Sequence, residues 1–133
     1  KLDKNIEFHF VSDIKLQPDE EFLTFLQNID NKYFLHSSIK NVIQDTDVLY
    51  VTRMQKERFN NDSSLNHINN IIINKDIIKN SKRNLIVMHP LPRNEELSTD
   101  LDNDNKSVYF KQVENGVYVR MAIIYTIYTN LNK

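Results

Sequence analysis

The sequence predicts an α/β fold in which a parallel sheet carries helices on both faces. Short apolar runs that are typical of strands alternate along the chain with segments whose apolar residues recur at helical spacing. This alternation favours parallel strands, because a parallel pair needs a crossover connection that is usually a helix. The 133 residues, of which 40% are hydrophobic and 26% charged, suit one globular domain.

The first third of the chain contains two strand candidates and two helix candidates. Residues 6–11 alternate apolar and polar side chains, as a half-covered strand does, and residues 33–35 form a second short strand. Between them Pro18 is expected at the first helical position, followed by two acids that favour the positive end of the helix dipole. A brief helix after a serine cap is expected at 39–43. The apolar face of the longer helix comprises Phe22, Leu23, Phe25, Leu26 and Ile29.

The middle of the chain contains two buried strand candidates. Residues 47–52 and 85–88 are short and almost continuously apolar, which is typical of strands covered on both faces. Residues 71–81 fit either a strand or a helix, and we assign a short helix. Polar loops are expected at 60–70 and 94–107.

The chain ends in a predicted helix over 116–131. Asn115 and Gly116 precede it as a turn signal, and its apolar residues recur at helical spacing. That stripe could face the core of this domain or another surface. Its members are Val117, Met121, Ile124, Tyr125, Tyr128 and Leu131.

The composition argues against several functions. Seventeen basic and 18 acidic residues are scattered along the chain, so no basic face for nucleic acid is expected. No apolar stretch approaches the roughly 18 residues of a membrane span. Without cysteine there is no disulfide scaffold or thiolate metal site, which fits a cytoplasmic protein. The four histidines lack ligand spacing and glycine occurs once, so we expect no metal, no cofactor and no glycine-rich phosphate loop.

Two polar segments follow the two buried strand candidates. Residues 52–58, TRMQKER, come after the first strand, and residues 89–93, HPLPR, come after the second. In open parallel sheets ligands bind beyond the carboxyl ends of the strands. We therefore expect both segments at one edge of the sheet.

The first segment offers a carboxylate site. Arg53 can form a two-pronged hydrogen bond to a carboxylate, with Gln55 two residues further on. Lys56 and Arg58 flank Glu57, so the local positive charge is partly compensated. The alternative interpretation is a solvated loop with internal salt bridges, which would contribute little energy.

The second segment is poor in hydrogen-bond donors. Pro90 and Pro92 fix their φ angles and carry no N–H, so the turn presents carbonyl oxygens that favour a ligand with N–H groups. The Leu91–Pro92 bond is a candidate for the cis form. The alternative is a rigid turn that only ends the strand. His89 is by itself more often a packed or hydrogen-bonded histidine than a catalytic one.

Three segments together resemble the aspartate carbamoyltransferase family. They are DVLYVTRMQKERF (47–59), VMHPLPR (87–93) and YFKQVENGVYVRMAII (109–124), and the resemblance runs from about Phe8 to the C-terminus. Ornithine-using relatives typically carry cysteine where Pro90 stands and lack the TRMQKER segment. The resemblance therefore favours aspartate as the second substrate.

The resemblance implies a role for each residue on the aspartate side of the site. Arg53 would hold an aspartate carboxylate, with Gln55 assisting. Glu57 would orient Arg53, and Arg58 would pair with a partner domain on closure.

On the carbamoyl side, the resemblance implies that Pro90, Leu91 and Pro92 would line the carbamoyl phosphate site, with His89 as a supporting residue. None of these residues needs to act as a covalent or acid–base catalyst. The enzyme must only orient two anionic reactants and stabilise developing charge.

The resemblance further implies a cytoplasmic transferase of pyrimidine biosynthesis. It would move the carbamoyl group of carbamoyl phosphate to L-aspartate, as a homotrimer whose amino-terminal domain binds carbamoyl phosphate through a Ser-x-Arg-Thr segment. Residues 1–133 would be most of the aspartate-binding domain, with 116–131 packing on the carbamoyl phosphate domain. The sequence lacks Ser-x-Arg-Thr and an initiator methionine, so we expect a piece of a longer protein that is inactive alone. The alternatives are a non-catalytic binding or regulatory module and a carbamoyltransferase for another amine.

Overall fold

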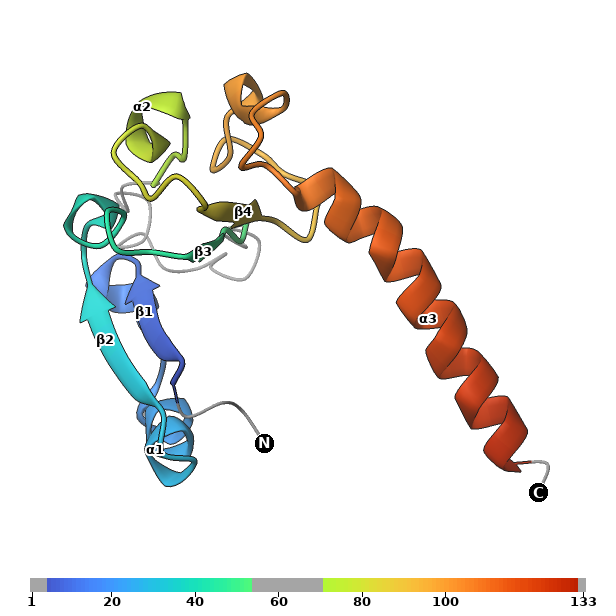
Figure 1. The fold of residues 1–133 in the computed structure, drawn as a ribbon. Helices are drawn as coiled ribbons and strands as arrows, with labels where there is room; N and C mark the ends of the chain where they lie inside the picture. The colour runs from blue at the N-terminus through green and yellow to red at the C-terminus, as the bar shows by residue number, and fades with distance from the viewer. Residues whose placement is uncertain (1–4, 54–70, 132–133) are drawn as a thin grey trace, which may run out of the picture. The chain divides into compact units, whose positions relative to one another are not determined.

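The computed structural model describes residues 5–53 and 71–131 (Figure 1). The chain divides into two compact units, residues 1–45 with 55–71 and residues 46–54 with 72–133. The described strands form two sheets of two parallel strands each, one sheet in each unit, with helices beside them. The predicted α/β class is therefore confirmed. The loop expected at 60–70 lies outside the described residues.

Strands β1 (Glu7–Val11) and β2 (Lys32–His36) form the sheet of the first unit. They pair in parallel over five positions, from Glu7 opposite Lys32 to Val11 opposite His36. Both strands were predicted, and the second extends one residue further at each end than its apolar core. This extension shows that backbone pairing continues beyond the apolar residues.

Helix α1 (Glu20–Asn28) connects β1 to β2. The Asp19 side chain accepts a 2.8 Å hydrogen bond from the Phe22 backbone N–H, so Asp19 is the N-cap. Pro18 therefore lies before the cap, and the prediction that it occupies the first helical position is wrong. The Asp19 carboxylate pairs an N–H of the first turn that would otherwise lack a partner, and this bond sets the start of the helix after Asp19.

Helix α1 ends in a left-handed turn without glycine. Asp30 has a φ of 65°, and its N–H donates to Gln27 O while the N–H of Asn31 donates to Leu26 O. These are the two hydrogen bonds of the Schellman motif, where glycine is the usual residue. Aspartate tolerates this conformation better than most residues, which lets a chain with one glycine form the turn.

The core of the first unit is small. The predicted apolar face of α1 buries only Leu26, whereas Phe22 and Phe25 are about half exposed. The expected brief helix is a single 3-10 turn, η2 (Ile39–Asn41), and its N-cap Ser38 makes no capping side-chain bond. A second 3-10 turn, η1, spans Ile14–Leu16. The other buried apolar residues in the described part of this unit are Ile39, Val42 and Ile43.

The sheet register brings two distant histidines together on the first unit. Nδ1 of His9 lies 3.0 Å from Nε2 of His36, although 27 residues separate them. His36 pairs with Val11, two positions beyond His9, so the rings are diagonal neighbours on one face. Within the described residues, no three metal-ligating side chains gather in a group that could hold a metal ion.

Strands β3 (Val48–Tyr50) and β4 (Ile86–Met88) form the sheet of the second unit. They lie side by side in Figure 1 and pair in parallel, from Val48 opposite Ile86 to Tyr50 opposite Met88. Both strands were predicted, but the expectation that they are covered on both faces is wrong, since Ile86 of β4 is 40% exposed and β3 is more open still. Val48 and Tyr50 point to one face of β3 and are each 51% exposed, whereas Leu49 points to the other face and is partly buried.

The segment before β4 contains helix α2 (Lys75–Ile78). The Asn74 side chain caps it by accepting a 3.1 Å hydrogen bond from the Ile77 N–H. Of the two structures that 71–81 could have formed, the chain adopts the short helix that we assigned. Ile73, just before the cap, is almost fully buried and forms a parallel bridge with Leu97.

Residues 94–107 are a packed segment and not only the polar loop that was expected. They contain the 3-10 turn η5 (Thr99–Leu101), and Ser107 forms a parallel bridge with Val87 of β4. Leu97 and Leu101 are exposed by only 1% and 0%. These two apolar residues, spaced four apart, anchor the polar segment to the core. The core of this unit comprises Val51, Ile73, Ile78, Leu85, Val87, Leu97, Leu101 and Tyr109.

Helix α3 spans Tyr109–Leu131, so the prediction that the last helix starts at Gly116 is wrong. Glycine inside a helix costs about 1 kcal/mol, which a helix of 23 residues tolerates. Tyr109 is fully buried and places the first turn against the core. Packing of that turn therefore outweighs the turn signal of Asn115 and Gly116.

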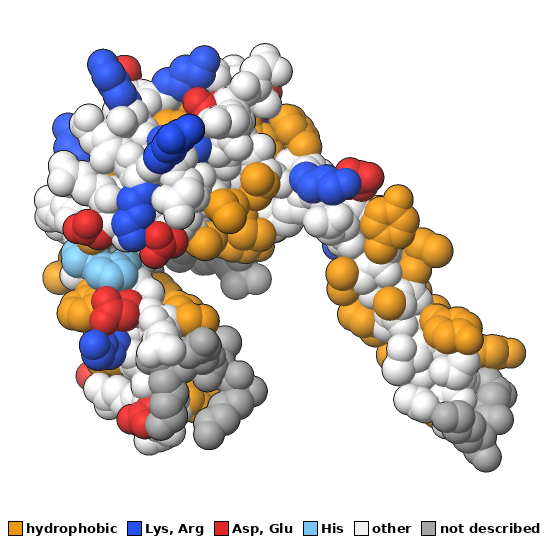
Figure 2. Space-filling model, viewed as in Figure 1, with side chains coloured by type: hydrophobic (Ala, Val, Ile, Leu, Met, Phe, Trp, Pro, Cys, Tyr) orange, Lys and Arg blue, Asp and Glu red, His pale blue; other side chains and the backbone are white. Residues whose placement is uncertain are grey.

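Most of α3 beyond its first turns is exposed. Figure 2 shows hydrophobic side chains along the length of this helix. Met121, Ile124 and Tyr125 of the predicted stripe are 61%, 68% and 70% exposed. Among the described residues, no helix combines the length and apolarity that crossing a membrane requires. The packing of this helix on a carbamoyl phosphate domain stays a prediction.

Candidate functional site

The parallel pairing of β3 and β4 places two predicted segments at one edge. The Val51 N–H, just beyond β3, donates a 2.9 Å hydrogen bond to the carbonyl of Met88, the last residue of β4. Arg53 comes two residues after Val51, and His89 directly follows Met88. The prediction that the segments after the two strands share one edge is therefore confirmed for their described residues.

Arg53 is the part of the first segment that the structure describes. It is exposed at the edge, two residues after the buried Val51. Gln55, Glu57 and Arg58 lie outside the described residues. An exposed arginine beside a strand end is accessible to a carboxylate from solvent.

The second segment forms a tight turn. Leu91–Pro92 is a cis peptide bond, as the sequence predicts for this position. Leu91 has a φ of 50°, in the left-handed region that few residues other than glycine adopt. Pro90 and Pro92 are exposed and Leu91 is partly buried. A residue held in this region marks the turn as a candidate site, because surrounding contacts must compensate the strain.

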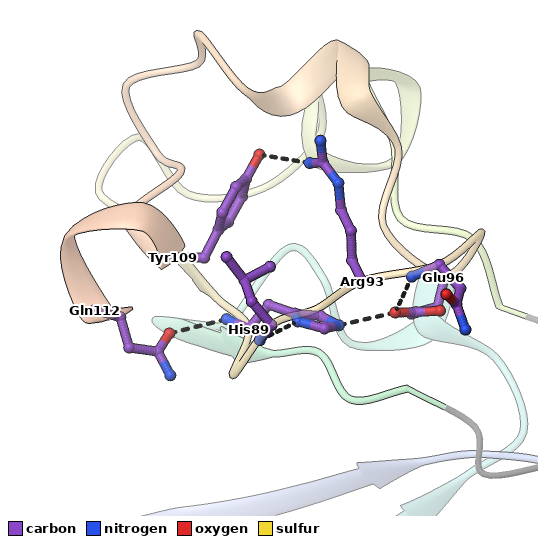
Figure 3. Close-up of polar contacts among 7 residues, drawn as sticks. His89, Arg93, Glu96, Tyr109 and Gln112 are labelled. Carbon is purple, nitrogen blue, oxygen red and sulfur yellow. Dashed lines mark hydrogen bonds and ion pairs between the residues drawn. The ribbon is translucent and has the colours of Figure 1, made fainter. Parts of the chain in front are cut away.

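His89 is buried and hydrogen-bonded on every side (Figure 3). Its exposed fraction is 0%, and its backbone N–H donates to Gln112 Oε1 at 2.9 Å. On the ring, Nδ1 lies 2.9 Å from the Leu91 N–H nitrogen and Nε2 lies 2.9 Å from Glu96 Oε1. His89 is therefore the packed, hydrogen-bonded histidine that was expected, and it lies beneath the turn.

Glu96 is a site residue that the sequence analysis did not identify. Its Oε1 accepts from the His89 ring and, at 2.9 Å, from the Asn94 backbone N–H. Burial acts to raise the pKa of the Glu96 carboxyl, but hydrogen bonds from the Asn94 and Glu96 backbone and from His89 outweigh it and lower the pKa below its usual value. The carboxylate is therefore ionised near neutral pH.

Arg93 points away from the turn and toward Tyr109 (Figure 3). Both residues form a polar cluster with Asp102. The two terminal nitrogens of Arg93 bind the two carboxylate oxygens of Asp102, one of them at 2.7 Å. The Tyr109 hydroxyl donates to the same carboxylate at 2.6 Å and accepts from Arg93 at 3.3 Å. This cluster anchors residues 89–93 to η5 and to the start of α3.

The same contacts shift the protonation of the cluster. Hydrogen bonds from Arg93 and then from Tyr109 lower the pKa of Asp102 from 3.8 to about 2, and the bond to Asp102 raises the pKa of Arg93. Burial, followed by the bond to Asp102, raises the pKa of Tyr109. Asp102 and Arg93 are therefore fully charged across the neutral range.

We expect the Asp102 carboxylate to contribute acid-sensitive stability. Its pKa is lower in the folded state, so the contribution is present above pH 4 or so and is lost as the pH falls from 3.8 to about 2. We would measure the free energy of unfolding of the full protein as a function of pH. In Asp102→Asn this free energy should depend less steeply on pH within this window than in the unsubstituted protein. The matched control is Asp45→Asn, at an exposed position. Equal acid profiles for the two variants would contradict the expectation.

Gln112 is a second residue that the sequence analysis missed. From the first turn of α3 it accepts from His89 N–H and donates to the Tyr50 hydroxyl at 3.2 Å. It thereby links α3 to the ends of both β3 and β4. A glutamine on a helix carries no local pattern that reveals a partner 23 or 62 residues away.

The arrangement defines a class of protein. Parallel strands end at an edge where an exposed arginine stands beside a donor-poor turn built on a buried, hydrogen-bonded histidine. This arrangement is typical of α/β domains that bind small polar ligands beyond the carboxyl ends of their strands.

The family follows from a comparison with known protein families. Residues 3–127 match the family described as aspartate/ornithine carbamoyltransferase, Asp/Orn binding domain. The chain belongs to this family, and the match is to its Asp/Orn binding domain, which agrees with the resemblance.

Relatives named aspartate carbamoyltransferase match most of the chain. The aspartate carbamoyltransferase catalytic subunit of Methanobrevibacter smithii is 43% identical over 127 residues, which are 95% of this chain and 40% of the relative. Catalytic subunit 2 of Shewanella halifaxensis is 37% identical over 124 residues, 93% of this chain and 40% of the relative. The chain thus spans about two fifths of the length of these relatives.

Solved structures support the same family. Aspartate transcarbamoylase from Trypanosoma cruzi in complex with N-(phosphonacetyl)-L-aspartic acid is similar with a TM-score of 0.76 and 36% identity, covering 90% of this chain and 37% of that one. The same enzyme in complex with carbamoyl phosphate gives a TM-score of 0.77 and 35% identity, covering 90% and 39%.

Proposed function

We propose that this chain is the aspartate-binding part of an enzyme that transfers the carbamoyl group of carbamoyl phosphate to L-aspartate. In this reaction the aspartate amine forms a bond to the carbamoyl carbon and loses a proton. The bond from that carbon to the phosphate oxygen breaks, and phosphate leaves. The observation that carries the proposal is the shared edge of β3 and β4, which puts Arg53 beside the 89–92 turn.

The aspartate side of the site is assigned to the segment after β3. Arg53 binds a carboxylate of the substrate and Gln55 assists it. Glu57 orients Arg53, and Arg58 pairs with the partner domain on closure. The exposed position of Arg53 supports this assignment, since a carboxylate can reach it from solvent.

The carbamoyl side is assigned to the turn after β4. Pro90, Leu91 and Pro92 line it, and His89 supports the turn from below. A carbamoyl group carries an NH₂ that needs acceptors, and a turn with two prolines offers carbonyl oxygens with few competing donors. The left-handed conformation of Leu91 supports the assignment, because surrounding contacts must hold the backbone of the turn in this strained conformation.

The complete site requires groups from outside this chain. We propose an amino-terminal domain that binds carbamoyl phosphate and an assembly that is a homotrimer, working in pyrimidine biosynthesis in the cytoplasm. The length of the relatives supports a further domain, because this chain matches about 40% of them. The exposed apolar side chains of α3 are available to pack on it.

Turnover assays on the full-length protein test the proposal. With carbamoyl phosphate present, we expect carbamoylation of L-aspartate and not of L-ornithine. The 133 residues assayed by themselves should form no carbamoyl-aspartate, because they contain no Ser-x-Arg-Thr segment.

Other outcomes would contradict the proposal in separate ways. Preferred carbamoylation of ornithine or another amine would favour a different carbamoyltransferase. Binding of aspartate without turnover by the full-length protein would favour a regulatory module. Carbamoyl-aspartate formed by the 133 residues alone would refute the need for a second domain.

A further inference from the structure

The turn at 89–92 rests on a buried hydrogen-bond relay that begins at Glu96. The Glu96 carboxylate binds Nε2 of His89 at 2.9 Å, and Nδ1 of the same ring binds the Leu91 N–H at 2.9 Å. The His89 ring is fully buried, and the Glu96 side chain is only 12% exposed. Water therefore has little access to either nitrogen.

The partners of His89 determine which nitrogen carries the proton. A backbone N–H can only donate, so Nδ1 must accept and bears no hydrogen. The single proton of a neutral imidazole is then on Nε2, where the Glu96 carboxylate accepts it. Without that carboxylate, the other tautomer would place an N–H against the Leu91 N–H and abolish the second bond.

The Leu91 N–H in turn directs a carbonyl. Among the described residues only Leu91–Pro92 is cis, so the peptide between Pro90 and Leu91 is trans. In a trans peptide the C=O and N–H point in opposite directions. Because the N–H points at the buried imidazole, the Pro90 carbonyl points away from it, to the side where Pro90 itself is exposed.

We propose that Glu96 is a positioning residue that, through the tautomer of His89, aims the Pro90 carbonyl at the amino group of the carbamoyl donor. This inference rests on the proposed function, which supplies the ligand. It adds Glu96 to the site and gives His89 a defined task. The relay also explains how Leu91 stays in the left-handed region, since its N–H bond compensates part of the strain.

The tautomer of His89 can be measured in the absence of substrates. In the full-length protein labelled with ¹⁵N-histidine, long-range ¹H–¹⁵N correlation should show His89 protonated on Nε2 and bare on Nδ1. Glu96→Gln keeps an oxygen that can accept from Nε2 and should keep this tautomer. Glu96→Ala removes the acceptor and should shift His89 toward the other tautomer or toward exchange between the two.

Kinetics of the same variants connect the tautomer to the reaction. Loss of one aligned hydrogen bond predicts a fall in kcat of about tenfold for Glu96→Ala. The aspartate KM should change by less than about threefold, because Arg53 is not altered. Glu96→Gln should restore most of the kcat, and Glu95→Ala, which removes the neighbouring exposed carboxylate, should leave both constants unchanged.

Several results would overturn the inference. One is a proton on Nδ1 of His89 in the unsubstituted protein. Others are an unchanged tautomer and kcat in Glu96→Ala, or equal loss of kcat in Glu96→Gln and Glu96→Ala. Absence of carbamoyl transfer in the unsubstituted protein would instead refute the proposed function, while the tautomer measurement would still decide whether the relay exists.

Discussion

Replacing Arg53 with alanine is expected to raise the aspartate KM of the full-length protein by roughly 10- to 150-fold. A hydrogen bond to a charged group contributes about 1.5–3 kcal/mol, and each 1.4 kcal/mol corresponds to about a tenfold change in affinity. Arg53 lies exposed three residues beyond the end of β3, where a substrate carboxylate can approach it. Steady-state kinetics with varied aspartate would measure the change.

Two further variants make this experiment specific. Arg53→Lys keeps the charge but loses the planar two-pronged geometry, so its KM should lie between those of the unsubstituted protein and Arg53→Ala. Arg83→Ala removes the same charge from an exposed position before β4, at the opposite end of the strand. An aspartate KM that responds equally to Arg53→Ala and Arg83→Ala would refute the carboxylate assignment.

Replacing Arg93 with alanine is expected to destabilise the protein by about 2–3 kcal/mol. The change leaves the Asp102 carboxylate without its two guanidinium bonds, and breaking a partly buried charge pair by removing one partner is costly. The side chains of Arg93 and Asp102 are 17% and 28% exposed, so solvent screening keeps the loss below that of a fully buried pair. Denaturant unfolding of the full-length protein would measure it.

A surface pair supplies the matched control for Arg93. Lys111 and Glu114 form a 2.9 Å pair on α3, but their side chains are 65% and 54% exposed. Lys111→Ala should therefore cost about 0.5 kcal/mol or less. Arg93→Lys, which keeps the charge without the fork, should fall between the two variants. A loss for Arg93→Ala no larger than that for Lys111→Ala would contradict the anchoring role of the cluster.

The sequence predicted the parts of the site that depend on local chemistry. The apolar runs before Arg53 and His89 indicated two parallel strands, and their parallel pairing fixes where both segments emerge. The proline spacing indicated a stiff turn at Leu91–Pro92, which has the predicted cis bond. Each of these features follows from neighbouring residues, so a single sequence is sufficient to read them.

The remaining parts of the site depend on contacts between segments. Glu96 and Asp102 are two carboxylates in a stretch that reads as a polar loop, and only the fold shows that one binds His89 and the other binds Arg93. Gln112 has its partners 23 and 62 residues away. The start of α3 at Tyr109 was missed for the same reason, because burial of one side chain outweighed a local turn signal.

The sequence by itself determined the α/β class, the order of strands and helices, and the two segments that meet at one edge of a sheet. Apolar periodicity and proline geometry act over a few residues and are written directly in the chain. The tertiary structure alone decided how the turn at 89–92 is supported, with His89 buried between Glu96 and Leu91. Hydrogen bonds that hold a buried ring depend on which segments pack together, and the global core determines that packing.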